Sequence, residues 1–201
     1  MLSHVIAALD LPRVAISANG DPARFGAHGC PVLDDGAFPD QGPLAGILAG
    51  LDWAFAIGAE ALLSVPGDTP FIPRGLARHL SPAPACAAEQ EGRAHPLIAL
   101  WPVAARNALR ALLSRPGPRD VRRFAAAIGT RRVDFAPAAW DRFLNVNTPE
   151  DLARARALIG RMPVEGIGRM PVEGIGRMPV GTARREPAGK NEDGSDTGER
   201  E

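Results

Sequence analysis

The chain consists of short segments in which hydrophobic residues recur either at the spacing of a strand or at the spacing of a helix. From the N-terminus this pattern predicts a helix over residues 2–9, a strand over 13–19, a short strand over 30–36 and a helix over 42–58. Ser3 is the expected N-cap of the first helix, and Pro43 lies in the first turn of the second. The second helix has an apolar face made of Leu44, Ile47, Leu48, Leu51 and Phe55.

The same alternation continues through the rest of the chain. It predicts a strand over 60–68, a short helix over 73–80, a strand over 95–103, helices over 104–114 and 121–129, a strand over 131–135 and a helix over 148–159. Thr148 and Asp151 form a capping-box pattern at the start of the last helix. Strands that alternate with helices at short spacing indicate an α/β fold with a parallel or mostly parallel sheet.

Length and composition suit one ordinary domain. The 201 residues are 45% hydrophobic, which is enough for one core. Lys+Arg and Asp+Glu are equal at 23 each, so no polyanionic partner such as nucleic acid is expected. No apolar run reaches the roughly 18 residues of a membrane span, and the N-terminus lacks a secretory signal. Cys30 and Cys86 are far apart, which favours two reduced thiols in a cytoplasmic protein over a disulfide or a zinc site.

The composition changes at Gly160. The segment GRMPVEGI occupies residues 160–167, recurs at 168–175 and begins a third time at 176. This unit is much shorter than the roughly 20 residues of a solenoid repeat, and the polar residues after it cannot bury much apolar surface. We therefore predict a folded domain over residues 1–158, followed by a repeat-containing linker and disordered tail over 159–201.

Polar side chains follow three of the predicted strands at their carboxyl ends. They are Ser17 and Asn19 after the first strand, Asp34 and Asp35 after the second, and Asp68 after the third. Ligands of open α/β sheets bind outside these strand ends, so we expect the side chains to converge on one crevice. The glycine-bearing loop QGPLAG at 41–46 would let a base or a ribose approach the backbone closely.

Carboxylates without a neighbouring histidine or cysteine favour a hard cation such as Mg²⁺, which takes one or two carboxylates together with waters and substrate phosphates. Asp68 suits this role, and phosphoryl or nucleotidyl transfer is a chemistry that such a site serves. The same aspartate also precedes Thr69 and Pro70, as aspartate does in ordinary turns. The residue types alone leave a magnesium ligand and a turn residue as alternatives.

Five segments, in this order and spacing, resemble the nucleotidyltransferase family of molybdenum cofactor guanylyltransferase: NGDPARF, DQGPLAGILAGL, VPGDTPFIP, HPLIAL and FLNVNTPEDL. The resemblance covers residues 1–158 and is specific as a set. It implies a Rossmann-like three-layer fold and transfer of GMP from GTP to the molybdopterin form of the molybdenum cofactor, with Mg²⁺. Proteins of molybdenum cofactor biosynthesis or its chaperones would be the candidate protein partners.

The resemblance also implies roles for single residues. Asp68 would be the catalytic residue and would bind both Mg²⁺ and GTP, while Asp35 would contact the guanine nucleotide. Ser17 stands where the family pattern has asparagine, so its nucleotide contact would be shorter or pass through water. Further nucleotide contacts are expected from Asn19, from Gly42, Pro43, Leu44 and Gly46 around the base, and from Asn145 and Asn147 in the same cleft.

The chain as printed departs from the family pattern at its start. Family members open with a strand and a glycine-rich LAGGxSxRMGxxK loop, whereas this sequence begins at the helix that follows the loop. Backbone N–H groups of such a loop cradle a triphosphate, and its lysine offsets the negative charge. A missing central strand would also expose the ladders of its two neighbours. We therefore expect the chain to bind GTP weakly and to turn over poorly.

Two alternatives stay open on the sequence. One is a related transferase that uses CTP or a sugar nucleotide, and exchange of GTP for CTP in a binding titration separates it from the first reading. The other is non-enzymatic: a truncated relic, or a chain started within its gene, that at most binds a partner.

Overall fold

A computed structural model describes residues 1–89, 93–136 and 141–159. All of them belong to the first of two compact units, Met1–Arg169, whereas the second unit, Met170–Glu201, lies outside the described residues. The GRMPVEGI repeat and the tail beyond it also lie outside the described residues. The predicted boundary at residue 158 therefore stays a prediction.

Helices and strands alternate through the described residues. The α-helices are α1 (Leu2–Leu9), α2 (Pro43–Ala56), α3 (Leu76–Leu80), α4 (Arg106–Leu113), α5 (Val121–Ala127) and α6 (Pro149–Ile159), with 3-10 turns η1 (Pro22–His28) and η2 (Val103–Ala105). The strands are β1 (Ile16–Ser17), β2 (Val32–Leu33), β3 (Ala61–Ser64), β4 (Ala85–Glu89), β5 (Ala94–Pro102) and β6 (Arg131–Phe135). None of these helices is both long and apolar enough to cross a membrane.

The strands form two sheets. The larger sheet has the order β3-β5-β4-β6, in which β5 is antiparallel to both of its neighbours and β4 is parallel to β6. Three of its four strands therefore run in one direction, which confirms the mostly parallel sheet that the pattern predicted, with β5 as the reversed strand. The smaller sheet pairs β1 with β2 in parallel, and Ile16 lies opposite Val32.

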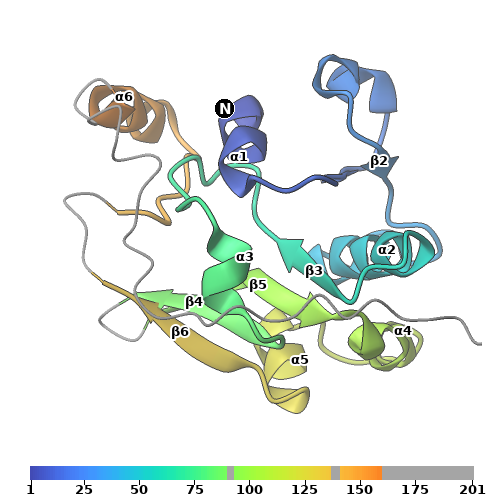
Figure 1. Ribbon diagram of the computed structural model, residues 1–201. Coiled ribbons are helices and arrows are strands. Elements are labelled where there is room, and N and C mark those ends of the chain that lie inside the picture. Colours follow the sequence, from blue (N-terminus) through green and yellow to red (C-terminus); the bar gives the residue numbers. More distant parts are fainter. Residues whose placement is uncertain (90–92, 137–140, 160–201) are drawn as a thin grey trace, which may run out of the picture. The chain divides into compact units, whose positions relative to one another are not determined.

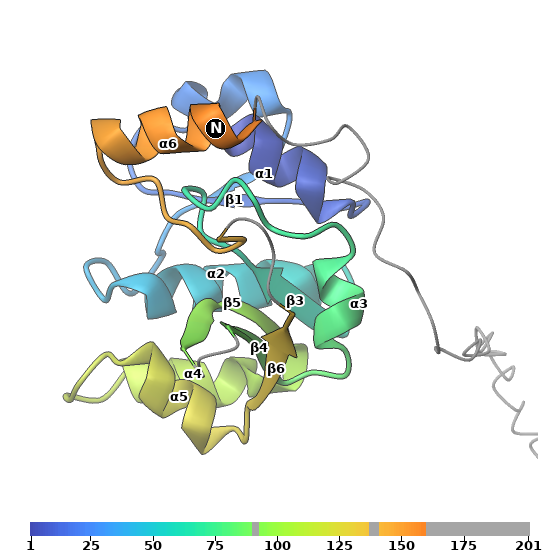
Figure 2. The ribbon, with the colours of Figure 1, turned by 90° about the vertical axis from the view of Figure 1, so that its left-hand side faces the viewer.

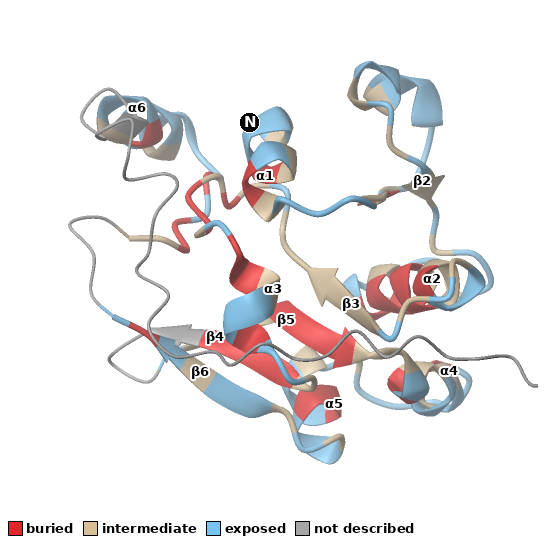
Figure 3. Ribbon diagram, viewed as in Figure 1, coloured by how far each residue is buried: buried red, intermediate tan, exposed pale blue. Residues whose placement is uncertain are grey.

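The larger sheet is the middle of three layers (Figure 1). Alternate residues of β5 point to opposite faces, so Trp101 packs with α2, α4 and α5, whereas Ile98 packs with α1 and α3. Figure 3 shows the buried residues gathered in α2, β4 and β5. The small sheet lies on the side of α2 away from α4 and α5 (Figures 1 and 2). These layers confirm the three-layer α/β fold.

Strand β4 is the element that the sequence pattern missed. Its sequence ACAAE consists mainly of small residues and has no alternation of apolar and polar positions. It nevertheless pairs with β5 on one side and β6 on the other, and Ala85 and Ala87 are fully buried. Small side chains suit a central strand with helices close above and below, so the tertiary position makes this segment a strand.

Two predicted details of the helices were wrong. Ser3 lies inside α1, whose N-cap is Met1 without a side-chain capping bond, although the bounds of the helix are those predicted. Phe55 does not join the buried stripe of α2 and is 57% exposed. The guanidinium carbon of Arg106 lies 3.9 Å from the centre of the Phe55 ring, and this cation–π contact with α4 replaces core packing.

The two cysteines are free thiols, as the sequence predicted. Cys86 is buried in the core on β4, and burial raises the pKa of its thiol above the usual value although the nearby charge of Arg132 opposes the shift. The thiol of Cys86 is therefore an inert packing group.

The predicted capping box is present at the start of α6. The hydroxyl of Thr148 accepts a hydrogen bond from the backbone N–H of Asp151 at 3.1 Å, and the Asp151 carboxylate accepts one from the N–H of Thr148, also at 3.1 Å. The backbone N–H of Asn147 donates to the same carboxylate at 3.2 Å. These bonds lower the pKa of Asp151 below its usual value, and the bond from Asn147 has the largest effect.

We expect the Asp151→Ala substitution to lower the free energy of unfolding near pH 7 and to have less effect in acid. A carboxyl with a lowered folded pKa stabilises the fold above its unfolded pKa of about 3.9, and the contribution is lost as the pH falls through the folded value. Urea unfolding at about pH 7 and about pH 2 measures the difference. Glu150→Ala, a neighbouring exposed acid on α6, is the control, and an equal pH dependence in both variants would contradict the prediction.

Candidate functional site

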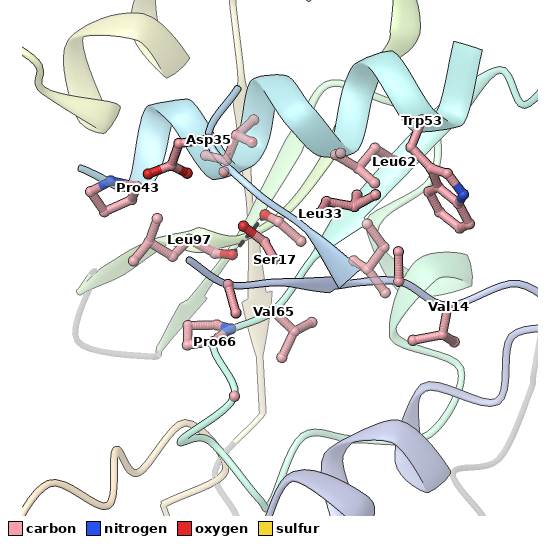
Figure 4. A pocket seen from close by; sticks show the side chains of 18 of the residues that line it. Val14, Ser17, Leu33, Asp35, Pro43, Trp53, Leu62, Val65, Pro66 and Leu97 are labelled. Atoms are coloured by element: carbon pink, nitrogen blue, oxygen red, sulfur yellow. Dashed lines mark hydrogen bonds between the residues drawn. The ribbon is translucent and has the colours of Figure 1, made fainter. Parts of the chain in front are cut away.

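A pocket of about 400 Å³ lies between β1 and β3, with α2 along one side. Figure 4 shows its two ends: Asp35 and Pro43 lie at one, and Trp53 and Val14 lie at the other. The end near Asp35 also contains Ser17 and carries most of the polar side chains. We call it the polar end, and of the predicted strand-end residues it brings together Ser17, Asn19 and Asp35.

The N-terminus of α2 brings backbone close to the polar end. Gly42 precedes the helix with φ 64° and ψ −156°, a conformation that glycine adopts without strain, and Pro43 occupies the first helical turn. A Cβ atom on Gly46 would lie 2.5 Å from the Oγ of Ser17. Gly46 therefore permits a close approach of α2 to Ser17, and Gly42, Pro43 and Gly46 all line the pocket.

Asn19 and Asp35 form a reciprocal hydrogen-bonded pair at the polar end. The Nδ2 of Asn19 donates to Oδ2 of Asp35 at 2.6 Å, and the backbone N–H of Asp35 donates to Oδ1 of Asn19 at 3.0 Å. The other oxygen of Asp35, Oδ1, lies 4.0 Å from the position that a Cβ atom on Gly46 would take. Asn19 therefore fixes the Asp35 carboxylate and leaves Oδ1 directed along the N-terminal turn of α2.

Asp34 does not share this role. Its Oδ1 accepts a hydrogen bond from the backbone N–H of Gly36 at 2.9 Å, which closes a local turn after β2. The residue is exposed and does not line the pocket between β1 and β3. Of the two acids after β2, the structure thus directs only Asp35 to the pocket.

Asp68 sits in a tight turn just beyond β3. The hydroxyl of the fully buried Thr69 donates to the carbonyl of Pro66 at 2.7 Å and closes the turn. Pro66 and Gly67 line the pocket, whereas Asp68 is the next residue and is not part of the lining. Its Oδ1 is buried and has no hydrogen-bond partner among the described residues. A buried carboxylate oxygen without a donor is costly, so this atom suits a bound cation.

Asn145 and Asn147 lie next to Asp68 and not in the pocket. The N–H of Val146, the residue between them, donates to the backbone carbonyl of Asp68 at 2.9 Å. Both asparagines are exposed and neither lines the pocket. The backbone N–H of Asn147 takes part in capping α6. The NVNTP segment thus supports the Asp68 turn from the side of α6.

Leu44 differs from its neighbours on the QGPLAG loop. It is fully buried in the core around Trp101, and it does not line the pocket. Its contribution here is to anchor the first turn of α2 on the sheet.

The lining of the pocket is neutral apart from one negatively charged side chain. Asp35 is the one charged residue in its lining, so no arginine, lysine or histidine of the described residues faces a bound phosphate there. Groups of three or more histidine, cysteine, aspartate or glutamate residues that could hold a metal are absent from the described part of the chain. A metal ion held by Asp68 would therefore have to take its remaining ligands from water and substrate, as Mg²⁺ does.

A family model described as "MobA-like NTP transferase domain" matches residues 1–132. This match spans more than half of the chain. The chain belongs to the family of MobA-like NTP transferase domains.

Relatives within this family are close in sequence. The chain is 55% identical over 159 residues to a molybdenum cofactor guanylyltransferase from Acidiphilium cryptum, a match covering 78% of this chain and 80% of the relative. It is 54% identical over 149 residues to a protein of the same name from Cereibacter sphaeroides, covering 73% and 75% of the two chains.

Solved structures agree with this family fold. The molybdopterin-guanine dinucleotide biosynthesis protein A from Archaeoglobus fulgidus matches with a TM-score of 0.61 at 16% identity, covering 80% of this chain and 86% of that one. The 2-C-methyl-D-erythritol 4-phosphate cytidylyltransferase from Thermus thermophilus matches with a TM-score of 0.51 at 20% identity, covering 79% and 88%. At these identities the likeness shows the fold alone.

The pocket also contains residues that the strand-end argument did not single out. Trp53 of α2 and the apolar residues Leu62, Leu63 and Val65 along β3 line its larger part. Ser64 also lines it, and its hydroxyl donates to the carbonyl of Leu97 at 2.8 Å while it accepts from the indole N–H of Trp101 at 2.8 Å. In the sequence these residues form only an apolar strand, and that pattern gives no indication that the strand lines a pocket.

Proposed function

We propose that the chain transfers GMP from GTP to the molybdenum cofactor, with the molybdopterin phosphate as acceptor. The supporting observation is the convergence of Ser17, Asn19, Asp35 and the glycine-bearing start of α2 on one end of a pocket. This convergence occurs in a chain that is 55% identical to a molybdenum cofactor guanylyltransferase. The site and the relative's name thus point to the same substrate class.

In the proposed reaction an oxygen of the acceptor phosphate attacks the α-phosphorus of GTP. A new P–O bond forms there, the bond from the α-phosphorus to the α,β-bridging oxygen breaks, and pyrophosphate leaves with that oxygen. The protein makes no covalent bond, so its contribution is to position the two substrates and to compensate the charge on their phosphates.

Asp35 is the residue that we assign to the guanine base. A carboxylate accepts hydrogen bonds from the two N–H donors on the Watson–Crick edge of guanine, which cytosine does not present in that arrangement. Asn19 holds Oδ2 of Asp35 and thereby orients Oδ1, while Gly42, Pro43 and Gly46 would admit the flat ring beside the backbone. Ser17 would contribute a hydroxyl to the ribose or the base.

Asp68 is the residue that we assign to Mg²⁺, because its buried Oδ1 has no donor among the described residues. The ion, when bound, would neutralise charge on the phosphates of GTP and on the leaving pyrophosphate. Asn145 and Asn147 flank the backbone bond that holds the Asp68 turn, and we propose that their exposed amides face the same nucleotide.

The direct test is incubation of the chain with Mg²⁺, a molybdopterin-type acceptor and GTP labelled at the α-phosphate. We expect label to appear in the guanine dinucleotide cofactor with GTP and not with CTP. Turnover should be slow, because no cation among the described residues lines the pocket. Equal labelling from CTP, or labelling no greater than without protein, would contradict the proposal.

A further inference from the structure

The loop between β2 and α2 connects two parts of the proposed base site. It follows directly after Asp35 and ends at Gly42, which Pro43 follows, and all three of these residues line the pocket. Figure 4 shows Asp35 and Pro43 at the same end of it. We call residues 36–42 the base loop. Its conformation sets how the Asp35 carboxylate lies relative to the backbone of Gly42.

The base loop has an irregular backbone. Asp40 has φ 60°, which is uncommon for a residue other than glycine, and Gly42 has φ 64°. Such a conformation at Asp40 persists where surrounding contacts hold it. At the start of the loop, the N–H of Phe38 donates to the carbonyl of Asp35 at 3.0 Å and closes one turn. The end of the loop, from Asp40 to Gly42, lies beyond that turn.

Two side chains anchor the base loop to the rest of the protein. Phe38 packs against the buried cluster around Trp101. Gln41 is bound by an arginine that is 78 residues away in the sequence: the Nε of Arg119 donates a hydrogen bond to its Oε1. Arg119 lies between α4 and α5, so this bond ties the end of the base loop to a distant segment.

The C-terminal end of α4 fixes the guanidinium of Arg119. Its Nη1 donates to the carbonyl of Leu112 at 3.2 Å, and its Nη2 donates to the carbonyls of Leu113 at 3.1 Å and Arg115 at 2.6 Å. Carbonyls at a helix C-terminus lack partners within the helix and carry partial negative charge, so a cation binds them well. One planar group therefore caps α4 and at the same time directs its Nε at Gln41.

The body of α2 is held to α4 by a separate contact. The Nη2 of Arg110 lies 2.6 Å from both carboxylate oxygens of Asp52, and the Nη1 of Arg106 donates to the same carboxylate at 3.3 Å. These bonds lie in the third turn of α2 and do not involve Arg119. Loss of the Arg119 bond should therefore release the base loop and leave the helix in place.

We propose that Arg119 is a positioning residue that sets the preference for GTP over CTP by holding the base loop through Gln41. Arg119 does not line the pocket, so it acts through the loop and not on the nucleotide. Guanine would use the Asp35 carboxylate and the Gly42 backbone together, and a ligand held by two groups loses affinity when their spacing becomes variable. Cytosine lacks the donor pair for Asp35 and should lose little. This inference rests on the proposed function.

The first test is the Arg119→Lys substitution, because a lysine has one compact ammonium group and cannot bridge Gln41 and the α4 carbonyls. Isothermal titration with GTP and with CTP, each with Mg²⁺, measures the effect. We expect the affinity for GTP to fall about tenfold and that for CTP to change less than about twofold. An equal fall for both nucleotides would indicate general damage and overturn the proposal.

Arg131→Lys is the matched control. The guanidinium of Arg131 also caps a helix, because it donates to the carbonyls of Leu80 and Pro82 at the end of α3. None of these bonds goes to the base loop. The control should therefore leave the affinities for both nucleotides unchanged, and a tenfold loss of GTP affinity in it would overturn the proposal.

A double-mutant cycle tests whether Arg119 acts through Gln41. Gln41→Leu keeps the approximate size of the side chain and removes the acceptor, so it should lower GTP affinity about as much as Arg119→Lys. Because both changes break the same bond, the double variant should lose about tenfold and not about a hundredfold. Independent effects that multiply to a hundredfold would overturn the proposed route.

Hydrogen exchange tests the tie without a nucleotide. In the ligand-free chain, the backbone amides of residues 36–42 should exchange about tenfold faster in Arg119→Lys and Gln41→Leu than in the parent or in Arg131→Lys, because the loop opens more often. Unchanged exchange would overturn the positioning role whatever nucleotide binds. A parent chain that binds GTP no more tightly than CTP would contradict the proposed function, and with it the selectivity assigned to Arg119, so the two failures are distinguishable.

Discussion

The Asp68→Asn substitution is expected to reduce the rate of GMP transfer about a thousandfold while leaving the protein at least as stable as before. A metal ion on the phosphates supplies several kcal/mol of charge stabilisation, and about 4 kcal/mol corresponds to three factors of ten in rate. Asparagine has the same shape but lacks the negative charge that attracts the ion. The measurement is the rate of label transfer over a range of Mg²⁺ concentrations.

Stability distinguishes the two readings of Asp68 that the sequence left open. If Asp68 is a metal ligand, its buried and unpartnered Oδ1 is a cost to the protein without metal, so loss of the charge should keep or raise the thermal midpoint. If Asp68 serves the turn alone, Asp68→Asn should lower the midpoint and leave the activity of the folded fraction intact. Asp134→Asn, which removes an exposed carboxylate on β6, is the matched control and should change neither quantity.

The second large effect is expected at Trp101. Its side chain is fully buried between the sheet and α5, where its ring lies 5.8 Å from that of Phe124. Trp101→Ala removes a large aromatic group from a packed core, so we expect the free energy of unfolding to fall by about 3–5 kcal/mol. This is a large fraction of the stability of an ordinary domain, which is about 5–15 kcal/mol. Urea unfolding followed by circular dichroism measures it.

A milder variant separates the packing of Trp101 from its hydrogen bond. Trp101→Phe keeps most of the ring but removes the N–H that donates to the Ser64 hydroxyl at 2.8 Å, and we expect a loss of about 1–2 kcal/mol. Ser64→Ala in the same background completes a double-mutant cycle, in which a coupling of about 0.5–1.5 kcal/mol is expected. A Trp101→Ala protein that unfolds at the same urea concentration as the parent would contradict the assigned core.

Local patterns in the sequence predicted most elements, because their causes are local. The apolar stripe of Leu44, Ile47, Leu48 and Leu51 makes α2 a helix in any compact context, and the buried faces agree. The capping box of Thr148 and Asp151 similarly marks where α6 begins, since both hydrogen bonds form within one turn. By contrast β4 has no such local signal, and pairing with β5 and β6 makes it a strand.

The candidate site likewise has features that the sequence predicts and features that only the tertiary structure shows. Asp35 and Asn19 could be predicted as site residues because strand ends of an α/β fold share one edge. Their reciprocal hydrogen bonds could not be predicted, because 16 residues separate them and only the pairing of β1 with β2 brings them together. Asp34 and Asp35 are neighbours with the same side chain, and only the turn at Gly36 decides that the first closes a loop and the second faces the pocket.

The sequence by itself determined the class of fold, the family resemblance and the strand ends where the polar side chains lie, because each depends on residue type and short-range spacing. The tertiary structure alone decided which of these side chains meet, that Leu44 belongs to the core, and that Oδ1 of Asp68 is buried without a donor among the described residues. It also decided that residues of β1 and of β3, which belong to different sheets, line one pocket. The physical reason is that hydrogen bonds and burial between distant segments depend on their arrangement in space, which no local pattern of residues contains.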